Sequence, residues 1–379
     1  MTRRVVICRS NPISPDPRVE KEGRSLLQAG YQVALLAWDR SAELPQQERI
    51  DGMPCYRLPI RAQYATGMRN LPDLLRWQWG LLKWLVRHRR DYDIIHACDF
   101  DTVLPALYCQ RLHRKKVVYD IFDFYADHLR RTPALIKKAI RALDIGAVNR
   151  ADAVILADDS RWAQIRGAQP RVSAVIYNSP EDIPPQSISP AEQVYKPEAS
   201  RLHLAYIGLL QVERGLFELL AVLRHRPEWT LSLAGFGGDE AQIKEQIRQM
   251  PNVAWYGRVP YQMALQLSAA ADVLIATYDP AIPNHRYSSP NKVFEAMLLG
   301  KPIIVARETN MDRMIIQENC GVVIPYGDKD ALEVALQQLQ DNLDLRLRLG
   351  ENARKAYDSR YGWRIMQDRL VKLYEQLAD

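Results

Sequence analysis

The feature that most constrains the fold is an alternation of short apolar runs with segments of helical period, kept along almost the whole chain. The first half contains the runs RVVIC, YQVALLAW, YDIIHA, KVVYDIF and ADAVILA, and the second half LHLAYIG, WTLSLAG, NVAWYG, ADVLIAT and KPIIVA. Apolar strands that alternate with amphipathic helices are typical of parallel sheets covered by helices. The sequence therefore predicts an α/β protein built from doubly wound sheets.

A proline-rich stretch, SPEDIPPQSISPAEQVYKPEAS at 179–200, interrupts this rhythm and has no sustained apolar period. Such composition is typical of a linker, and a chain of 379 residues is long enough for two domains. We therefore expect a Rossmann-like domain at 1–185, a linker at 186–200 and a second Rossmann-like domain at 201–358. A helix at 359–379 follows, and its apolar face carries Met366, Leu370, Leu373 and Leu377.

The composition is that of a soluble globular protein, with 47% hydrophobic and 25% charged residues. The start, MTRRVVICRS, has only a short apolar run flanked by arginines, so we expect neither a signal peptide nor a spanning helix, and a cytoplasmic location. The five cysteines are scattered without a CxxC pair. This pattern argues against a disulfide framework and against a zinc site, so no metal site is expected.

Positive charge is concentrated in residues 57–150, which hold 18 Lys and Arg against 9 Asp and Glu, whereas the remaining residues hold 33 against 36. A basic half is compatible with nucleic acid, an anionic membrane or phosphorylated substrates. Nucleic acid is disfavoured because no recognition helix or aromatic-basic sheet motif accompanies the charge. A nicotinamide dehydrogenase is disfavoured because CRSNPISPDP, after the first strand, lacks GxGxxG.

Residues 71–90, LPDLLRWQWGLLKWLVRHRR, combine leucines and tryptophans with arginines and a lysine. Two interpretations are open. A helix with this composition suits the interface of an anionic membrane, where Trp77 and Trp84 would contact lipid. The fold also needs a core helix here, in which case the tryptophans would be buried. The first interpretation predicts a peripheral protein on the inner leaflet.

The segment YSSPNKVFEAMLLGKPIIVA, 287–306, is typical of a turn, an amphipathic helix and a buried strand. Pro290 suits the helix start, and the apolar positions should face the core: Val293, Phe294, Met297 and Leu298. The unpaired amides of the first turn, together with Lys292, could hold a phosphate. Glu295, one turn further, could accept hydrogen bonds from sugar hydroxyls. Alternatively, Lys292 and Glu295 form an ordinary surface pair at i,i+3 spacing.

Other loops after strands point to the same kind of ligand. YIGLLQVERGLFELL, 206–220, places Gly208 at a strand end and Arg214 at a helix start, which is again suitable for a phosphate. WYGRVP follows another strand, and the backbone of Val259 there could meet the edge of a base. Ligands of parallel sheets bind beyond the carboxyl ends of the strands, where all these loops lie.

These motifs, in this order, resemble the retaining glycosyltransferases of family 4 in the sequence-based classification, which have the GT-B fold of two facing Rossmann-like domains with a cleft between them. DPRVEKEGRSLLQAGYQVALLAW is similar to the family's first strand-helix-strand unit. GENARKAYDSRYGWRIMQDRLVKLYEQL is similar to its ending, where the last helix crosses back to the first domain. The resemblance implies transfer of a sugar from a UDP- or GDP-sugar to an acceptor hydroxyl with retention of configuration, without a cofactor or metal.

The resemblance also implies roles for single residues. Arg214 would grip the donor diphosphate as a catalytic group, with Lys292 as the second cation, and Glu295 would bind the ribose. The residues implied at the donor site are Gly208, Arg258, Val259, Tyr287, Ser289, Pro290, Asn291, Val293 and Glu295. Those implied at the acceptor side or cleft are Asp16, Arg18, Asp99, Asp123 and His128.

Three positions depart from the family's pattern. The family's paired glutamates stand eight residues apart, but Tyr287 occupies the first position here. Leu209 follows Gly208, where a basic residue is usual, so Lys292 would supply the missing charge. YDIFDFYADH replaces a YDxHE-like segment. These departures leave the donor sugar and the acceptor open.

The absence of an evident nucleophile suggests front-face attack, with the leaving charge stabilised by Arg214, Lys292 and the helix N-terminus. An interfacial 71–90 helix would favour a lipid-linked or glycan acceptor in cell-surface glycan or glycolipid assembly, and otherwise soluble small molecules are the better candidates. A non-transferring enzyme of the same fold, such as a sugar-nucleotide epimerase, is the alternative function.

Overall fold

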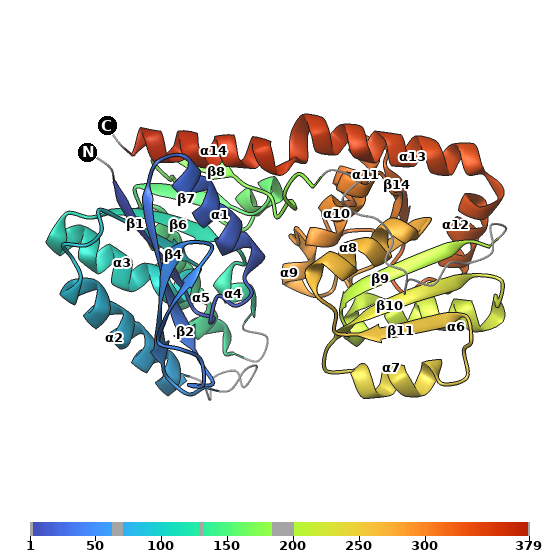
Figure 1. Ribbon diagram of the computed structural model, residues 1–379, viewed down its shortest axis with the longest axis horizontal. Helices are drawn as coiled ribbons and strands as arrows, with labels where there is room; N and C mark the ends of the chain where they lie inside the picture. Colours follow the sequence, from blue (N-terminus) through green and yellow to red (C-terminus); the bar gives the residue numbers. More distant parts are fainter. Residues whose placement is uncertain (1–2, 63–70, 129–131, 184–200, 378–379) are drawn as a thin grey trace. The chain divides into compact units, whose positions relative to one another are not determined.

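The computed structural model describes residues 3–183 and 201–377 with gaps at 63–70 and 129–131. The expected linker at 186–200 lies outside the described residues. The chain divides into two compact units, Met1–Tyr177 with Met366–Asp379, and Asn178–Ile365. Each unit contains one sheet and its own helices (Figure 1).

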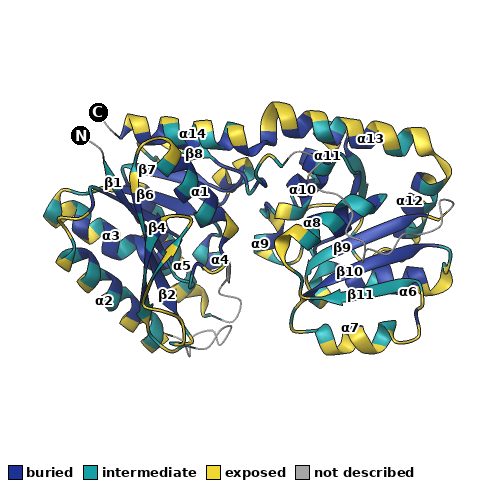
Figure 2. Cartoon of the chain, viewed as in Figure 1, coloured by how far each residue is buried: buried dark blue, intermediate teal, exposed yellow. Residues whose placement is uncertain are grey.

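Unit 1 is built on an eight-stranded sheet of order β3-β4-β2-β1-β5-β6-β7-β8. All neighbouring strands are parallel except β3, which pairs antiparallel with β4 at the edge. The strands are β1 (Arg4–Arg9), β2 (Gln32–Asp39), β3 (Gln47–Ile50), β4 (Met53–Pro59), β5 (Ile94–Cys98), β6 (Lys116–Ile121), β7 (Ala153–Leu156) and β8 (Ser173–Val175). The central strands are buried on both faces (Figure 2), as their continuous apolar runs predict.

Helices cover both faces of this sheet, because alternate side chains of β5 contact different helices on its two faces. Ile95 and Ala97 join the core under α2 (Leu71–Arg87), α3 (Phe100–His113) and α5 (Ala134–Val148). His96 points to the opposite face, where it meets side chains of α1 (Pro17–Gln28) and α14 (Trp363–Gln376). A short helix, α4 (Tyr125–His128), follows β6.

The last helix, α14, packs on unit 1 through the apolar face that the sequence predicts. Met366, Leu370, Leu373 and Leu377 are all buried. The guanidinium of Arg369 donates to the carbonyl oxygen of Val175 on β8 at 2.9 Å, which ties the helix to the edge of the sheet.

Helix α2 resolves the two interpretations of its tryptophans. Trp77 is fully buried and stacks on Trp38, with ring centroids 5.2 Å apart and planes inclined by 8°. Trp84 is half-buried against His88. The expectation that these two tryptophans would contact lipid is therefore wrong for Trp77, because the face that it occupies covers the sheet. Trp79 lies on the opposite face and is 69% exposed.

Among the described residues, the helices are too short or too polar for any of them to span a bilayer.

Unit 2 has a six-stranded, fully parallel sheet of order β11-β10-β9-β12-β13-β14. The strands are β9 (His203–Leu209), β10 (Thr230–Phe236), β11 (Val253–Gly257), β12 (Val273–Ala276), β13 (Ile303–Ala306) and β14 (Gly321–Ile324). The helical segments are η4 (Val212–Arg214), α6 (Leu216–His225), α7 (Glu240–Ile247), α8 (Tyr261–Ala270), α9 (Pro283–Arg286), α10 (Asn291–Leu299), α11 (Met311–Glu318), α12 (Lys329–Asp341), α13 (Leu343–Ala356) and η5 (Tyr357–Tyr361).

In both sheets the strand order reverses direction at one place, between β1 and β5 in unit 1 and between β9 and β12 in unit 2. The loops that leave two neighbouring strands there turn to opposite sides of the sheet and leave a crevice at the carboxyl ends. These two places are therefore where ligand-binding residues are expected.

Candidate functional site

At the reversal point of unit 2, Lys292 lies against the end of β9. Gly208 has a φ of +147°, and a Cβ atom there would be only 2.8 Å from Cε of Lys292. A side chain at position 208 would therefore displace the lysine. The ammonium nitrogen of Lys292 also lies 3.6 Å from the centroid of the ring of Tyr206, which belongs to the same strand as Gly208.

The ammonium group of Lys292 is buried although its stem is partly exposed, and Nζ has no hydrogen-bond partner among the described residues. Burial, which has the largest effect, and the nearby Arg214 guanidinium together lower the pKa of Lys292 to about 7, whereas Glu295 acts in the opposite direction. A buried ammonium without a partner is costly, because it has lost its hydration and gained no hydrogen bond. An anion at this place would remove that cost.

Arg214 is held at the same point by hydrogen bonds between η4 and the residues that follow β12. Its carbonyl oxygen accepts a hydrogen bond from Oγ1 of Thr277, and the next residue, Gly215, has a φ of +66°. A Cβ on Gly215 would lie within 2.2 Å of the same Oγ1, so only glycine allows this approach. The Arg214 guanidinium lies 4.0 Å from the centroid of the Tyr278 ring, and its Nε has no hydrogen-bond partner among the described residues.

The third cationic element is the N-terminus of α10. Pro290 occupies the N-cap position and makes no side-chain capping bond, which leaves the amides of Asn291 and Lys292 available, whereas the amide of Val293 donates to the carbonyl oxygen of Pro290 at 3.1 Å. Ser289 is buried with a hydroxyl that lacks a hydrogen-bond partner in the described part of the chain. Its carbonyl oxygen accepts from the side-chain amide of Asn178 at 3.0 Å. Asn291 is exposed and Val293 is buried, as the amphipathic pattern predicts.

Glu295 is 9% exposed, one turn after Lys292. The phenol of Tyr261 hydrogen-bonds to it, and its carboxylate acts electrostatically on Lys292. The alternative of an ordinary surface pair between Lys292 and Glu295 is wrong, because both charged groups point into the protein and no direct ion pair between them is among those described.

The remaining residues implied for the donor lie around this point. Val259 is half-buried in the turn after β11, packed beside Ala234 and Leu267. Arg258 is exposed, with its guanidinium 4.6 Å from the centroid of the Phe236 ring at the end of β10. Tyr287 is half-buried at the end of α9.

At the reversal point of unit 1, Arg9 ends β1 and joins two aspartates. It donates to Asp16 at 2.9 Å and also to Asp99. Asp99 has a φ of +66° and accepts from the backbone amides of Phe122 and Asp123, at 2.9 and 3.3 Å. Burial raises the pKa of Asp99 to about 6, in spite of Arg9.

The other residues implied for unit 1 are engaged elsewhere. Arg18 is buried and donates to both carboxylate oxygens of Asp120, at 2.9 and 3.2 Å, and to the carbonyl oxygen of Ile176. Asp123 accepts from Arg161 at 2.9 Å. His128 ends α4, and its side chain lies outside the description.

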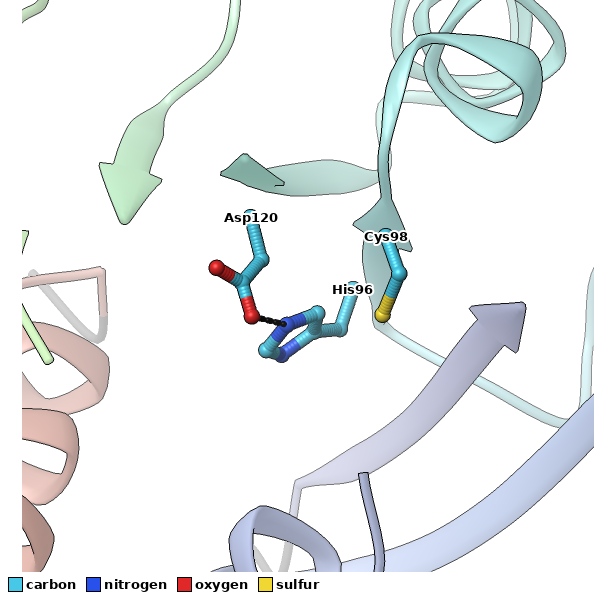
Figure 3. A group of neighbouring side chains, drawn as sticks. All are labelled: His96, Cys98 and Asp120. Carbon is cyan, nitrogen blue, oxygen red and sulfur yellow. Dashed lines mark hydrogen bonds and ion pairs between the residues drawn. The ribbon is translucent and has the colours of Figure 1, made fainter. Parts of the chain in front are cut away.

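One group of side chains in unit 1 has the composition of a metal site: His96, Cys98 and Asp120 (Figure 3). Its electrostatics fit a structural network better. Asp120 already pairs with Arg18, His96 contacts the Tyr374 hydroxyl at 2.8 Å, and burial raises the pKa of the Cys98 thiol. A cysteine binds a metal ion as a thiolate, and burial disfavours this charged form of Cys98.

Three contributors were missed by sequence reasoning: Tyr206, Tyr278 and Arg9. The two tyrosines lie in apolar runs and look like core residues. Arg9 directly follows the run VVIC, and its position at a strand end is a signal that sequence reasoning could have used.

Comparisons with known proteins identify the family and the fold of the chain. Residues 191–356 match the family described as glycosyl transferases group 1, and residues 15–179 match the glycosyl transferase 4-like domain. An uncharacterized glycosyltransferase of Methanocaldococcus jannaschii is 21% identical over 213 residues, which cover 54% of this chain and 53% of that protein. A GDP-mannose-dependent monoacylated alpha-(1-6)-phosphatidylinositol monomannoside mannosyltransferase of Corynebacterium glutamicum is 25% identical over 162 residues, 41% of each chain. The chain thus spans about half or less of the length of these relatives.

Solved structures of similar fold cover nearly the whole chain. Sucrose-phosphate synthase from Thermosynechococcus elongatus matches with a TM-score of 0.79 at 17% identity, over 99% of both chains. Anabaena HepE in complex with UDP-glucose matches with a TM-score of 0.70 at 17% identity, also over 99% of both chains. At such identities the likeness establishes the fold.

Proposed function

The chain belongs to the glycosyl transferases of group 1 and has the GT-B fold with two parallel-sheet domains, and on this premise we propose that it transfers a sugar from a nucleotide-sugar to an acceptor hydroxyl with retention of configuration. The observation that carries the proposal is the pair of cations at the reversal point of unit 2. Lys292 and Arg214 have no carboxylate partner among the described residues, and an incoming diphosphate would supply the missing negative charge.

The first amides of α10 add to this anion site. Backbone N–H groups at a helix N-terminus point at an anion and carry the positive end of the helix dipole. The structure of HepE with UDP-glucose supports a nucleotide-sugar as the donor class. Glu295, which lies one turn inside the same helix, would accept hydrogen bonds from ribose hydroxyls.

In the transfer step, the acceptor oxygen bonds to the anomeric carbon while the bond from that carbon to the diphosphate oxygen breaks. The electron pair of that bond goes to the leaving diphosphate, which takes up the acceptor proton. Arg214, Lys292 and the start of α10 stabilise the developing negative charge, and no metal is invoked for this role. Attack on the same face as departure gives retention.

We further propose that the acceptor is a lipid-linked sugar or a glycan at the surface of an anionic membrane. One stripe of α2 exposes Leu71, Leu75 and Trp79, by 48%, 58% and 69%. These residues are spaced four apart, so their side chains lie on one face of the helix. Exposed cations flank them, among them Arg76, Lys83 and Arg87. This combination suits the boundary between headgroups and acyl chains. The transferase of C. glutamicum, which is named for a phosphatidylinositol substrate, supports the same class.

The proposal is tested by incubating the protein with UDP-, GDP- and ADP-sugars, with and without lipid-linked and soluble saccharide acceptors. The expected result is acceptor-dependent release of nucleoside diphosphate and a product with the anomeric configuration of the donor, read by NMR coupling constants. Conversion of the donor sugar without an acceptor would favour the epimerase alternative. An inverted product would exclude the retaining mechanism.

A further inference from the structure

A cavity lies at the amino ends of the unit 1 strands, the end of the sheet opposite to Arg9 and Asp99. It has a volume of about 400 Å³. The first residues of β1 and β2 line it, among them Arg4 and Gln32, which are register partners at the amino ends of the strands. Small-molecule sites typically have volumes of ~300–1,000 Å³. The cavity is therefore large enough for a small ligand and separate from the site built on the carboxyl ends.

One wall of this cavity is aromatic. The rings of Trp84 and His88 stack with centroids 4.3 Å apart and planes inclined by 23°, and the Tyr56 ring lies 5.3 Å from Trp84. All three rings line the cavity and remain partly exposed. The Tyr56 and Trp84 planes are inclined by 49°, so the rings form an angled aromatic wall, which can contact the C–H face of a sugar ring or another ring compound.

The polar groups around the cavity include several that are not committed to the protein. The hydroxyls of Tyr31 and Tyr56 and the guanidinium of Arg49 have no hydrogen-bond or ion-pair partner among the described residues. By contrast, Arg4 is bound by Asp93, and Tyr92 donates to a backbone carbonyl. These two hydroxyls and the Arg49 cation can bind hydroxyl groups and one negative charge. The lining also holds the carboxylate of Asp91, which pairs with His88 at 3.0 Å.

We propose that this cavity is a binding site for an anionic saccharide, separate from the transfer site. The sugar ring packs against the aromatic wall of Trp84 and Tyr56, its hydroxyls bond to Tyr31 and Tyr56, and its acidic group pairs with Arg49. A neutral sugar leaves Arg49 without a partner, and a purely apolar ligand leaves both hydroxyls without one. The proposal does not depend on the transfer reaction, because the site lies within unit 1 and uses none of the residues assigned to the donor.

The test is isothermal titration of the full chain with glucuronate, glucose 6-phosphate and glucose. Glucuronate or glucose 6-phosphate, or both, should bind saturably, and glucose at least tenfold more weakly, because a charge-assisted hydrogen bond is lost. The two anionic probes distinguish a carboxylate from a phosphate as the preferred group. Arg49→Gln should weaken anionic binding about tenfold, and Tyr56→Phe by a smaller factor. The control Arg248→Gln, at an exposed arginine of unit 2, should leave binding unchanged.

A UDP titration in the presence of the saturating saccharide separates the two sites. UDP affinity should stay the same, and Arg49→Gln should keep the wild-type UDP affinity. Three results would overturn the proposal: no binding of either anionic probe, binding that is unchanged in Arg49→Gln with a wild-type melting temperature, or competition between saccharide and UDP. If Arg49→Gln proves unstable, glucuronate is titrated into Tyr56→Phe instead. An affinity equal to that of the wild type in this variant would then overturn the proposal.

Discussion

Lys292 should make donor binding depend on pH. The pKa of its ammonium is lowered to about 7 in the free protein, chiefly by burial. A donor diphosphate binds the charged form, so binding must be accompanied by proton uptake above this pKa. The nucleotide-sugar diphosphate itself has no group that titrates near neutrality. The apparent Kd should therefore be flat well below pH 7 and approach a tenfold rise per pH unit above it, which amounts to about 50-fold between pH 7 and pH 9.

The dependence of folding stability on pH that Lys292 causes has the opposite sign to that of a lysine held in an ion pair. In the unfolded chain Lys292 keeps its usual pKa of about 10.4, so between pH 7 and 10 the unfolded state binds more protons than the folded state. Stability in the absence of donor should rise with pH over that range, with a slope of at most about 1.4 kcal/mol per pH unit from this group. Lys292→Met should remove this slope.

The assay is titration of a non-reacting nucleotide-sugar analogue from pH 6 to 9, in two buffers of different ionisation enthalpy so that proton uptake is measured directly. Lys292→Met should bind weakly and without the pH dependence above 7. Lys301 provides a matched control, because burial lowers its pKa too but it lies at the end of α10 near Asp272. Lys301→Met should keep the wild-type profile. Flat affinity in the wild type, or an unchanged profile in Lys292→Met, would refute the reasoning.

Four further changes test the remaining assignments. Arg214→Ala should lower the transfer rate by a factor of about 10² to 10³ with an unchanged melting temperature, because one donor to the leaving group is lost; turnover near that of the wild type would contradict its role. Glu295→Gln should weaken nucleotide binding more than it alters the pH profile of kcat, whereas loss of a pH limb at constant affinity would make it an acid or base. Trp79→Ser should reduce salt-sensitive binding to anionic vesicles without changing donor affinity, and a wild-type protein that ignores such vesicles at low salt would exclude the membrane surface. Trp77→Ala should instead destabilise the fold by about 3–5 kcal/mol in urea unfolding, because it empties the space beside Trp38.

The sequence by itself determined the local features of this protein. Continuous apolar runs identify buried parallel strands because both faces of such strands are covered, and Pro290 marks a helix start because its backbone conformation suits that position. The prediction of an anion site around Lys292 also follows locally, from the amides of a first helical turn. These properties depend on neighbours within a few residues, so they can be read along the chain.

Only the tertiary structure decided which side chains meet. The strand order brings the ends of β9 and β12 together, and this places Lys292 against Gly208 and Tyr206 and Arg214 against Tyr278. The same holds for α2, whose tryptophans occupy different faces of one amphipathic helix. Its sequence pattern fits a core and a membrane interface equally well, and only the packing of the helix on the sheet buries Trp77 and leaves Trp79 exposed. The physical reason is that contacts between distant residues depend on the order and register of strands, which no local pattern specifies.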